Sequence, residues 1–179
     1  MHKDVESILF TQEQIAARVK ELGRAIREEY AGKELVMVCV LKGACVFFAD
    51  LLRAAEVPAE IDFMAVSSYG FGAQSSGHVN IIKDISAPVA GRHVLLVEDI
   101  IDSGNSLYAL KELFGKRGAA SVKICAFLDK KARRTAKVEA DHVGYAIEDA
   151  FVVGYGLDYA EKYRELPYIG ILKREVYEK

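Results

Sequence analysis

The hydrophobic positions along the chain alternate between two spacings, and each spacing predicts one kind of element. Apolar residues follow one another almost without interruption in 35–41 (LVMVCVL), 93–97 (HVLLV) and 121–128 (SVKICAFL). Such runs, rich in β-branched residues, are typical of strands that are buried on both faces of a parallel sheet. Shorter strand-like runs stand at 61–68, 79–82, 142–147, 151–153 and 168–172.

Apolar residues spaced by three or four positions predict helices between these strands. The first helix begins with a capping box, Thr11 to Gln14, and we expect it to end near Gly32. Its apolar stripe consists of Ile15, Val19, Leu22 and Ile26. Further helices are predicted over 45–55 and from 107 onward. Alternating strands and helices indicate an α/β fold around a mostly parallel sheet, with smaller irregular elements in the last third.

Composition and charge narrow the possible functions. The chain has 179 residues, 51% of them hydrophobic, with 24 Lys and Arg against 26 Asp and Glu. This balance predicts one soluble globular domain over 1–179, because no repeat, low-complexity tract or linker divides the chain. A net charge of −2 gives no general reason to bind nucleic acid or an anionic membrane. No apolar run approaches the ~18 residues of a membrane span.

The cysteines and histidines do not form a recognisable metal or redox motif. Cys39, Cys45 and Cys125 are an odd set without a C-x-x-C pair, and we interpret them as buried thiols in a reducing cytoplasm. The four histidines lack the spacing of metal ligands, so we do not expect them to bind a metal.

The segment with the most chemical information is 94–106 (VLLVEDIIDSGNS). An apolar strand leads here to the adjacent acids Glu98 and Asp99, and then to a glycine-containing turn that opens a helix. Ligands of open α/β sheets bind at such strand ends, and the N-terminus of a helix offers backbone N–H groups to a phosphate. Two carboxylates suit the hydroxyls of a ribose. The alternative is that Asp102 or Ser103 only caps the helix while the two acids are solvated.

At this motif the chain resembles the type I phosphoribosyltransferases, whose donor-binding motif is two acids, two residues and D-[ST]-G-x-[ST]. Residues 98–106 fit that pattern without a gap. Three further stretches also match: Leu41-Lys42-Gly43, Ser68-Tyr69-Gly70 and 151–159 (FVVGYGLDY). The similarity covers residues 8–171 and is strongest to the bacterial members of the family that act on hypoxanthine and guanine.

The resemblance implies a fold, an activity and a setting. It implies a central sheet flanked by helices, a small hood made from the chain ends, and a flexible lid at about 68–79. The expected reaction transfers the 5-phosphoribosyl group from 5-phosphoribosyl-1-pyrophosphate to hypoxanthine or guanine, giving IMP or GMP and pyrophosphate. Mg²⁺ is the implied cofactor. The resemblance further implies a cytoplasmic purine-salvage enzyme that forms a homodimer or homotetramer and binds neither nucleic acid nor a membrane.

The resemblance also implies roles for the residues of the acidic motif. The ribose 5-phosphate is expected to lie against four consecutive residues, Ser103, Gly104, Asn105 and Ser106. Glu98 and Asp99 would hold the ribose hydroxyls and contribute to the Mg²⁺ site, and Ile100 would contact substrate. Many eukaryotic relatives carry a lysine in place of Asn105, so this chain would hold the phosphate with one fewer cation.

The purine would be bound by residues from three parts of the chain. By resemblance, Asp102 is the general base at purine N7, and Lys130 donates to the 6-oxo group. Phe151 would stack on the base, and the main chain of Val152 would contact the other ring edge. On composition alone, 151–153 would instead be interpreted as core.

The remaining implied roles concern the pyrophosphate and the metal ion. Lys42 and Gly43 would bind pyrophosphate through backbone amides, and the Leu41–Lys42 bond can be cis in the family. Ser68 and Tyr69 would open the lid. Asp158 would bind Mg²⁺ largely through water, and Arg164 would contact pyrophosphate. The segment 41–43 lacks the G-x-x-x-x-G-K-[ST] spacing of a P-loop, and a plain strand-to-helix turn is its alternative interpretation.

Two alternatives remain open for the function and one for the basic run after Leu128. We interpret Lys131, Arg133 and Arg134 as a solvated face or, less specifically, a patch for nucleic acid. The protein could also be a relative that prefers xanthine, or a regulator with this fold that senses nucleotides. The base-recognition set and the lack of net positive charge argue against the regulator.

Overall fold

The main layer of the protein is a six-stranded, mostly parallel sheet. The computed structural model describes residues 1–67 and 80–178. The strand order is β4-β3-β2-β5-β6-β7, and only the β3–β4 pair is antiparallel. The bounds are β2 Leu35–Leu41, β3 Ala59–Ser67, β4 Asn80–Lys83, β5 His93–Ile101, β6 Ser121–Asp129 and β7 His142–Ala146. The predicted sheet is therefore confirmed.

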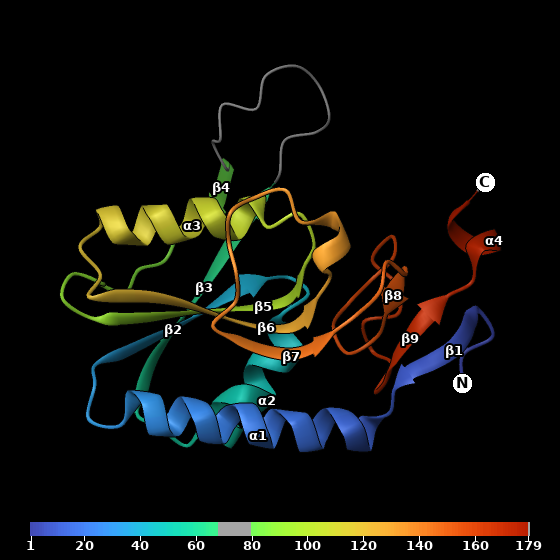
Figure 1. Cartoon of the computed structure of the whole chain (residues 1–179), viewed down its shortest axis with the longest axis horizontal. Coiled ribbons are helices and arrows are strands. Elements are labelled where there is room, and N and C mark those ends of the chain that lie inside the picture. The colour runs from blue at the N-terminus through green and yellow to red at the C-terminus, as the bar shows by residue number, and fades with distance from the viewer. Residues whose placement is uncertain (68–79, 179) are drawn as a thin grey trace.

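Helices cover both faces of this sheet (Figure 1). Helices α1 (Gln12–Tyr30) and α2 (Cys45–Ala55) lie on one face, and α3 (Asn105–Lys116) lies on the other. Strand β2 shows why its sequence has no polar position. Met37 packs in the core cluster under α1 and α2, whereas Val38 packs in the cluster under α3. Alternate side chains thus enter two cores, as expected of a strand buried on both faces.

The predicted start of α1 is confirmed at atomic detail. The Thr11 hydroxyl accepts a hydrogen bond from the Gln14 amide at 3.3 Å, and the Gln14 side chain accepts one from the Thr11 amide at 2.8 Å. This reciprocal capping satisfies two amides that the helix leaves unpaired. The helix ends at Tyr30, just before Gly32, which adopts a positive φ of 71°.

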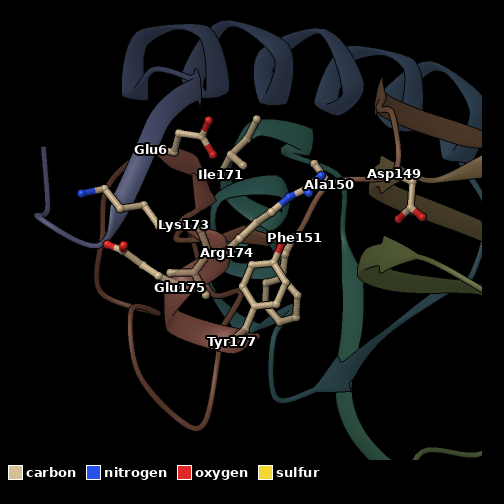
Figure 2. A pocket seen from close by; sticks show the side chains of 10 residues that line it. Glu6, Asp149, Ala150, Phe151, Ile171, Lys173, Arg174, Glu175 and Tyr177 are labelled. Atoms are coloured by element: carbon tan, nitrogen blue, oxygen red, sulfur yellow. The ribbon is translucent and has the colours of Figure 1, made fainter. Parts of the chain in front are cut away.

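A second, smaller sheet forms a hood from both ends of the chain. Its order is β1-β9-β8, all antiparallel, with bounds β1 Val5–Phe10, β8 Val152–Val153 and β9 Ile169–Leu172. A short helix, α4 (Arg174–Tyr177), follows β9. Figure 2 shows these elements beside a cavity of about 640 Å³. The hood was expected, but β1 and α4 were not, because their short runs mix polar and apolar residues.

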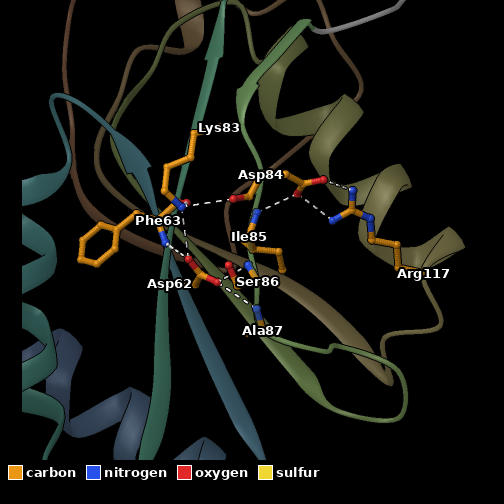
Figure 3. A network of polar contacts seen from close by, with 8 residues as sticks. All are labelled: Asp62, Phe63, Lys83, Asp84, Ile85, Ser86, Ala87 and Arg117. Carbon is orange, nitrogen blue, oxygen red and sulfur yellow. Dashed lines mark hydrogen bonds and ion pairs between the residues drawn. The ribbon is translucent and has the colours of Figure 1, made fainter.

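A polar network joins the connection after β4 to β3 and α3 (Figure 3). The Asp62 carboxylate on β3 accepts hydrogen bonds from the amides of Ser86 at 2.6 Å and Ala87 at 2.9 Å. The Arg117 guanidinium at the end of α3 binds both oxygens of Asp84, at 2.8 and 2.5 Å. The backbone that returns from β4 is therefore tied to both neighbouring elements.

The structure corrects two details of the sequence interpretation. Strand β5 does not end before the acids but continues through them to Ile101, because β6 pairs with it as far as Asp129. The prediction of three buried thiols is wrong for Cys45, which is exposed as the first residue of α2, while the other two cysteines are buried. None of the described helices is long and apolar enough to cross a membrane.

Candidate active site

The parallel strands end at one edge of the main sheet, and most of the predicted site residues follow those ends. Strand β2 leads to Lys42 and Gly43, β5 carries the acid pair, and β6 leads to Lys130. The hood stands over this edge, to the right in Figure 1, and carries Phe151 and Val152. Segments distant in sequence therefore meet at the carboxyl ends of the strands, where ligands bind in open α/β sheets.

The acid pair lies directly against the turn after β2. A Cβ atom on Gly43 would overlap the Asp99 carboxylate, so only glycine lets the turn approach this closely. A Cβ on Gly156 would likewise overlap the Gly43 carbonyl oxygen. The Leu41–Lys42 peptide bond is cis, as the resemblance allowed. The turn is thus packed between the acid pair and the chain that follows β8.

Burial and mutual repulsion place the two acids in an unfavourable electrostatic setting. Burial and the neighbouring Asp99 carboxylate raise the pKa of Glu98 well above its ordinary value. Burial also raises the pKa of Asp99, although a hydrogen bond from Glu98 and the charge of Arg164 oppose that rise. Two adjacent, half-buried carboxylates favour a ligand that brings hydrogen-bond donors or positive charge.

The turn after β5 has the form of an anion site at a helix N-terminus. Gly104, the N-cap residue of α3, has a φ of 80°, and Asn105 and Ser106 begin the helix. The Asn105 amide lies 3.4 Å from the Ser103 hydroxyl oxygen. One carboxylate oxygen of Asp102, Oδ1, is buried and has no hydrogen-bond partner among the described residues. An orphaned buried acceptor needs a donor, and a ligand can supply one.

Lys130 and Phe151 come together at the hood. Lys130 is 6% exposed, its Nζ donates to the Ala150 carbonyl at 2.9 Å, and it lies 3.6 Å from the Asp149 carboxylate. The Phe151 ring stacks on Tyr177 of α4, with centroids 4.8 Å apart and planes at 24° (Figure 2). At 36% exposure Phe151 is a surface aromatic and not core. An aromatic platform therefore stands one residue from the carbonyl that holds Lys130.

The main chain of Val152 is available for hydrogen bonding. Strand β8 is an edge strand, and the Leu172 amide donates to the Phe151 carbonyl at 2.8 Å. Because pairing directions alternate along an antiparallel strand, the polar groups of Val152 face away from β9. The side chains of Val152 and Val153 are buried, so the core interpretation holds for these two residues but not for Phe151.

A network of ion pairs joins the turn after β2 to the segment after β8. The Glu161 carboxylate binds Lys42 Nζ at 2.9 Å and Arg164 Nη2 at 3.0 Å. Arg164 Nη1 lies 3.0 Å from Asp158 Oδ1. Lys42, Asp158 and Arg164, predicted from distant motifs, are therefore brought into one cluster.

The sequence motifs did not identify every residue at this site, and one assignment based on them is wrong. Glu161 was not singled out, although it pairs with two predicted site residues. Arg134 was interpreted as part of a solvated face, which is wrong: its side chain is 10% exposed and pairs with the buried Asp129. The basic spacing after Lys130 gave no sign of this burial. Ser68 and Tyr69, with the whole expected lid at 68–79, lie outside the described residues.

Comparisons with known proteins agree with this geometry. A family model described as "Phosphoribosyl transferase domain" matches residues 6–160. The hypoxanthine-guanine phosphoribosyltransferase of Bacillus subtilis is 53% identical over 178 residues, covering 99% of each chain. That of Streptococcus thermophilus is 50% identical over 179 residues, covering 100% of this chain and 99% of its own.

A solved structure gives the same result for the fold. The crystal structure of a hypoxanthine phosphoribosyltransferase from Staphylococcus aureus matches with a TM-score of 0.96 and 47% identity, covering 100% of this chain and 97% of that one. Together with the strand-end site, this similarity shows that the chain belongs to the phosphoribosyltransferase family, in the group of hypoxanthine-guanine phosphoribosyltransferases.

Proposed function

We propose that the protein transfers the 5-phosphoribosyl group from 5-phosphoribosyl-1-pyrophosphate to hypoxanthine or guanine, which yields IMP or GMP and pyrophosphate. The observation that carries this proposal is the full-length similarity, near 50% identity, to proteins named hypoxanthine-guanine phosphoribosyltransferase. The meeting of the acid pair, the anion turn and Lys130 at one sheet edge supports it. The protein is then a purine-salvage pentosyltransferase.

The proposed roles follow the charge that develops during the reaction. As pyrophosphate leaves, the anomeric carbon of the ribose becomes positive, so the site has to neutralise the leaving group and orient the purine nitrogen. Arg164 and the turn at Lys42 and Gly43 would bind pyrophosphate. The turn 103–106 would bind the 5-phosphate, and Ile100 would contact substrate. Glu98 and Asp99 would accept hydrogen bonds from the ribose hydroxyls.

On the purine side, two charged groups have complementary tasks. Lys130 has three donors, of which one holds the Ala150 carbonyl and a second faces the Asp149 carboxylate at 3.6 Å, so one remains for a 6-oxo group. Asp102 would take the proton from N7, and its unpartnered Oδ1 fits that task. Phe151 would stack on the ring, and the free edge of Val152 would bind its far side.

We propose Mg²⁺ as the cofactor, with Asp158, Glu98 and Asp99 as its protein ligands. No group of three His, Cys, Asp or Glu residues in the described part of the chain is arranged to hold a metal by itself. Magnesium needs only one or two carboxylates when substrate oxygens and waters complete its shell, so the donor set fits. When bound, it would neutralise charge on the pyrophosphate.

Steady-state turnover of hypoxanthine, guanine, xanthine and adenine with the same donor tests the proposal. We expect turnover of hypoxanthine and guanine and rejection of adenine. Preferred turnover of xanthine would support the xanthine-preferring relative. Nucleotide binding without turnover of any base would support the regulator.

The other features implied by the family remain proposals. We propose that residues 1–179 act as a single domain, that the protein works in the cytoplasm and that it forms a homodimer or homotetramer. Light scattering of the purified protein measures the oligomeric state. A monomer at micromolar concentration would contradict that part.

A further inference from the structure

A single segment of chain, residues 130–136, binds the backbone of the turn that carries Asp102. The Lys130 amide donates to the Ile101 carbonyl at 2.9 Å. The amides of Thr135 and Ala136 both donate to the Ser103 carbonyl, each at 3.0 Å. Between these contacts, the Asp102 carbonyl accepts from the Arg134 guanidinium at 3.2 Å. Three successive carbonyls of the turn thus accept hydrogen bonds from one segment of the chain.

The direction of these carbonyls sets the direction of the amides. In a trans peptide unit, C=O and N–H point to opposite sides. Because the carbonyls of Asp102 and Ser103 face residues 130–136, the amides of Ser103 and Gly104 face the opposite way. Neither amide donates a hydrogen bond to any residue that the structure describes. Free, aligned amides at the start of α3 are the donors that a phosphate requires.

Among the residues that the structure describes, Arg134 is the only charged side chain that binds one of these carbonyls. Further contacts hold its guanidinium in place. Its guanidinium also donates to the Val138 carbonyl at 2.7 Å and pairs with the Asp129 carboxylate, which is 2% exposed. Gly104 lies so close that a Cβ there would come within 2.9 Å of Arg134 Cδ. One planar fork therefore links the end of β6, the turn after β5 and the loop at Val138.

We propose that Arg134 is a positioning residue for the phosphate turn: by binding the Asp102 carbonyl it directs the free amides of Ser103 and Gly104 at the 5-phosphate of the substrate. This inference rests on the proposed function, because it takes the ligand of the turn to be a ribose 5-phosphate. It assigns Arg134 no contact with substrate. A lysine keeps the charge beside Asp129 but cannot span the same acceptors, so the guanidinium shape is what matters.

The test compares Arg134→Lys with Lys131→Arg, a reciprocal exchange at an exposed position of the same segment. Calorimetric dissociation constants are measured for IMP, which carries the 5-phosphate, and for inorganic pyrophosphate, which does not. We expect Arg134→Lys to raise the dissociation constant of IMP by about 10- to 100-fold, the value of one misdirected charge-assisted hydrogen bond. The dissociation constant of pyrophosphate should change by less than about twofold. The Lys131→Arg control should bind both ligands as the wild type does.

Other outcomes contradict the inference. Unchanged IMP binding by folded Arg134→Lys, or equal losses for IMP and pyrophosphate, would reduce Arg134 to a structural ion pair. If Arg134→Lys does not fold, the double variant Asp129→Asn/Arg134→Gln removes both buried charges, and the same IMP-to-pyrophosphate comparison applies. The wild-type protein distinguishes failure of the proposed function from failure of this inference. If the wild type neither binds IMP nor transfers phosphoribose, the proposed function is wrong. If the wild type is active and the variant is unaffected, only the role of Arg134 is wrong.

Discussion

In the proposed function, the choice of base depends on Lys130. Its buried ammonium has donors and no acceptor, so it suits a 6-oxo group and repels the 6-amino group of adenine. We expect Lys130→Ala to lower kcat/KM for hypoxanthine by about 5- to 150-fold, which corresponds to roughly 1–3 kcal/mol. The measurement is steady-state turnover, with Lys131→Ala as the exposed control. Wild-type efficiency together with wild-type rejection of adenine would remove Lys130 from this role.

Asp102 should affect the rate much more than the binding of the donor. Asp102→Asn keeps the size of the side chain but cannot accept a proton, so kcat should fall by about 10²–10⁴. Binding of the pyrophosphate donor, measured separately by calorimetry, should change far less. A variant with nearly normal kcat would show that Asp102 only shapes the turn.

Glu98 should lower the stability of the protein at neutral pH. Its pKa is raised in the folded state, so the unfolded chain loses the proton first, and stability falls as pH rises from the ordinary pKa of about 4.5 to the folded one. At pH 7, Glu98→Gln should therefore unfold at a higher urea concentration than the wild type. This gain in stability should disappear below about pH 4. The exposed Glu112→Gln on α3 is the control. Equal midpoints at pH 7 would mean that no such cost exists.

At the scale of elements, the turn after β2 depends on its close approach to β5. Gly43→Ala would push a methyl group into the Asp99 carboxylate, so we expect at least a tenfold loss of kcat/KM, the effect of about 1.4 kcal/mol at the site. Gly115→Ala in α3 is the matched control, because a Cβ there meets nothing within 4 Å. Relief of the helical glycine should stabilise the control by about 0.5–1 kcal/mol and leave turnover unchanged. Normal activity of Gly43→Ala would disprove the tight contact.

The same scale explains what the sequence could predict. The central strands β2, β5 and β6 carry nearly uninterrupted apolar runs because both of their faces are buried, so their positions were predictable to within a few residues. Strand β1 was not, since it pairs with β9 near the other end of the chain and has only one face to bury. The motif residues were located through the family resemblance. Contacts such as Lys42 with Glu161, 119 positions apart, depend on packing that no local pattern records.

For the whole molecule, acid should weaken the ties between the β4 connection, β3 and α3. Backbone amides lower the pKa of Asp62, although burial opposes them, and Arg117 lowers the pKa of Asp84. A lowered folded pKa gives stability that is complete above the ordinary value of 3.8 and is lost as pH falls through the folded value. Asp84→Asn should therefore unfold at lower urea than wild type at pH 7, and the difference should shrink at pH 3. A difference independent of pH would exclude this linkage.

The pairing of β1 with β9 also has a consequence for how the protein is made. Residues 5–10 are synthesised more than 150 residues before 169–172, so β1 stays unpaired until β9 has been made. Contacts so far apart in sequence form late, after the local and sheet contacts. A nascent chain could then complete its main sheet, with the acid pair and Lys130, while Phe151 and Val152 of the hood are not yet in place. On this order of assembly, the aromatic platform of Phe151 and Tyr177 is the last part of the site to form.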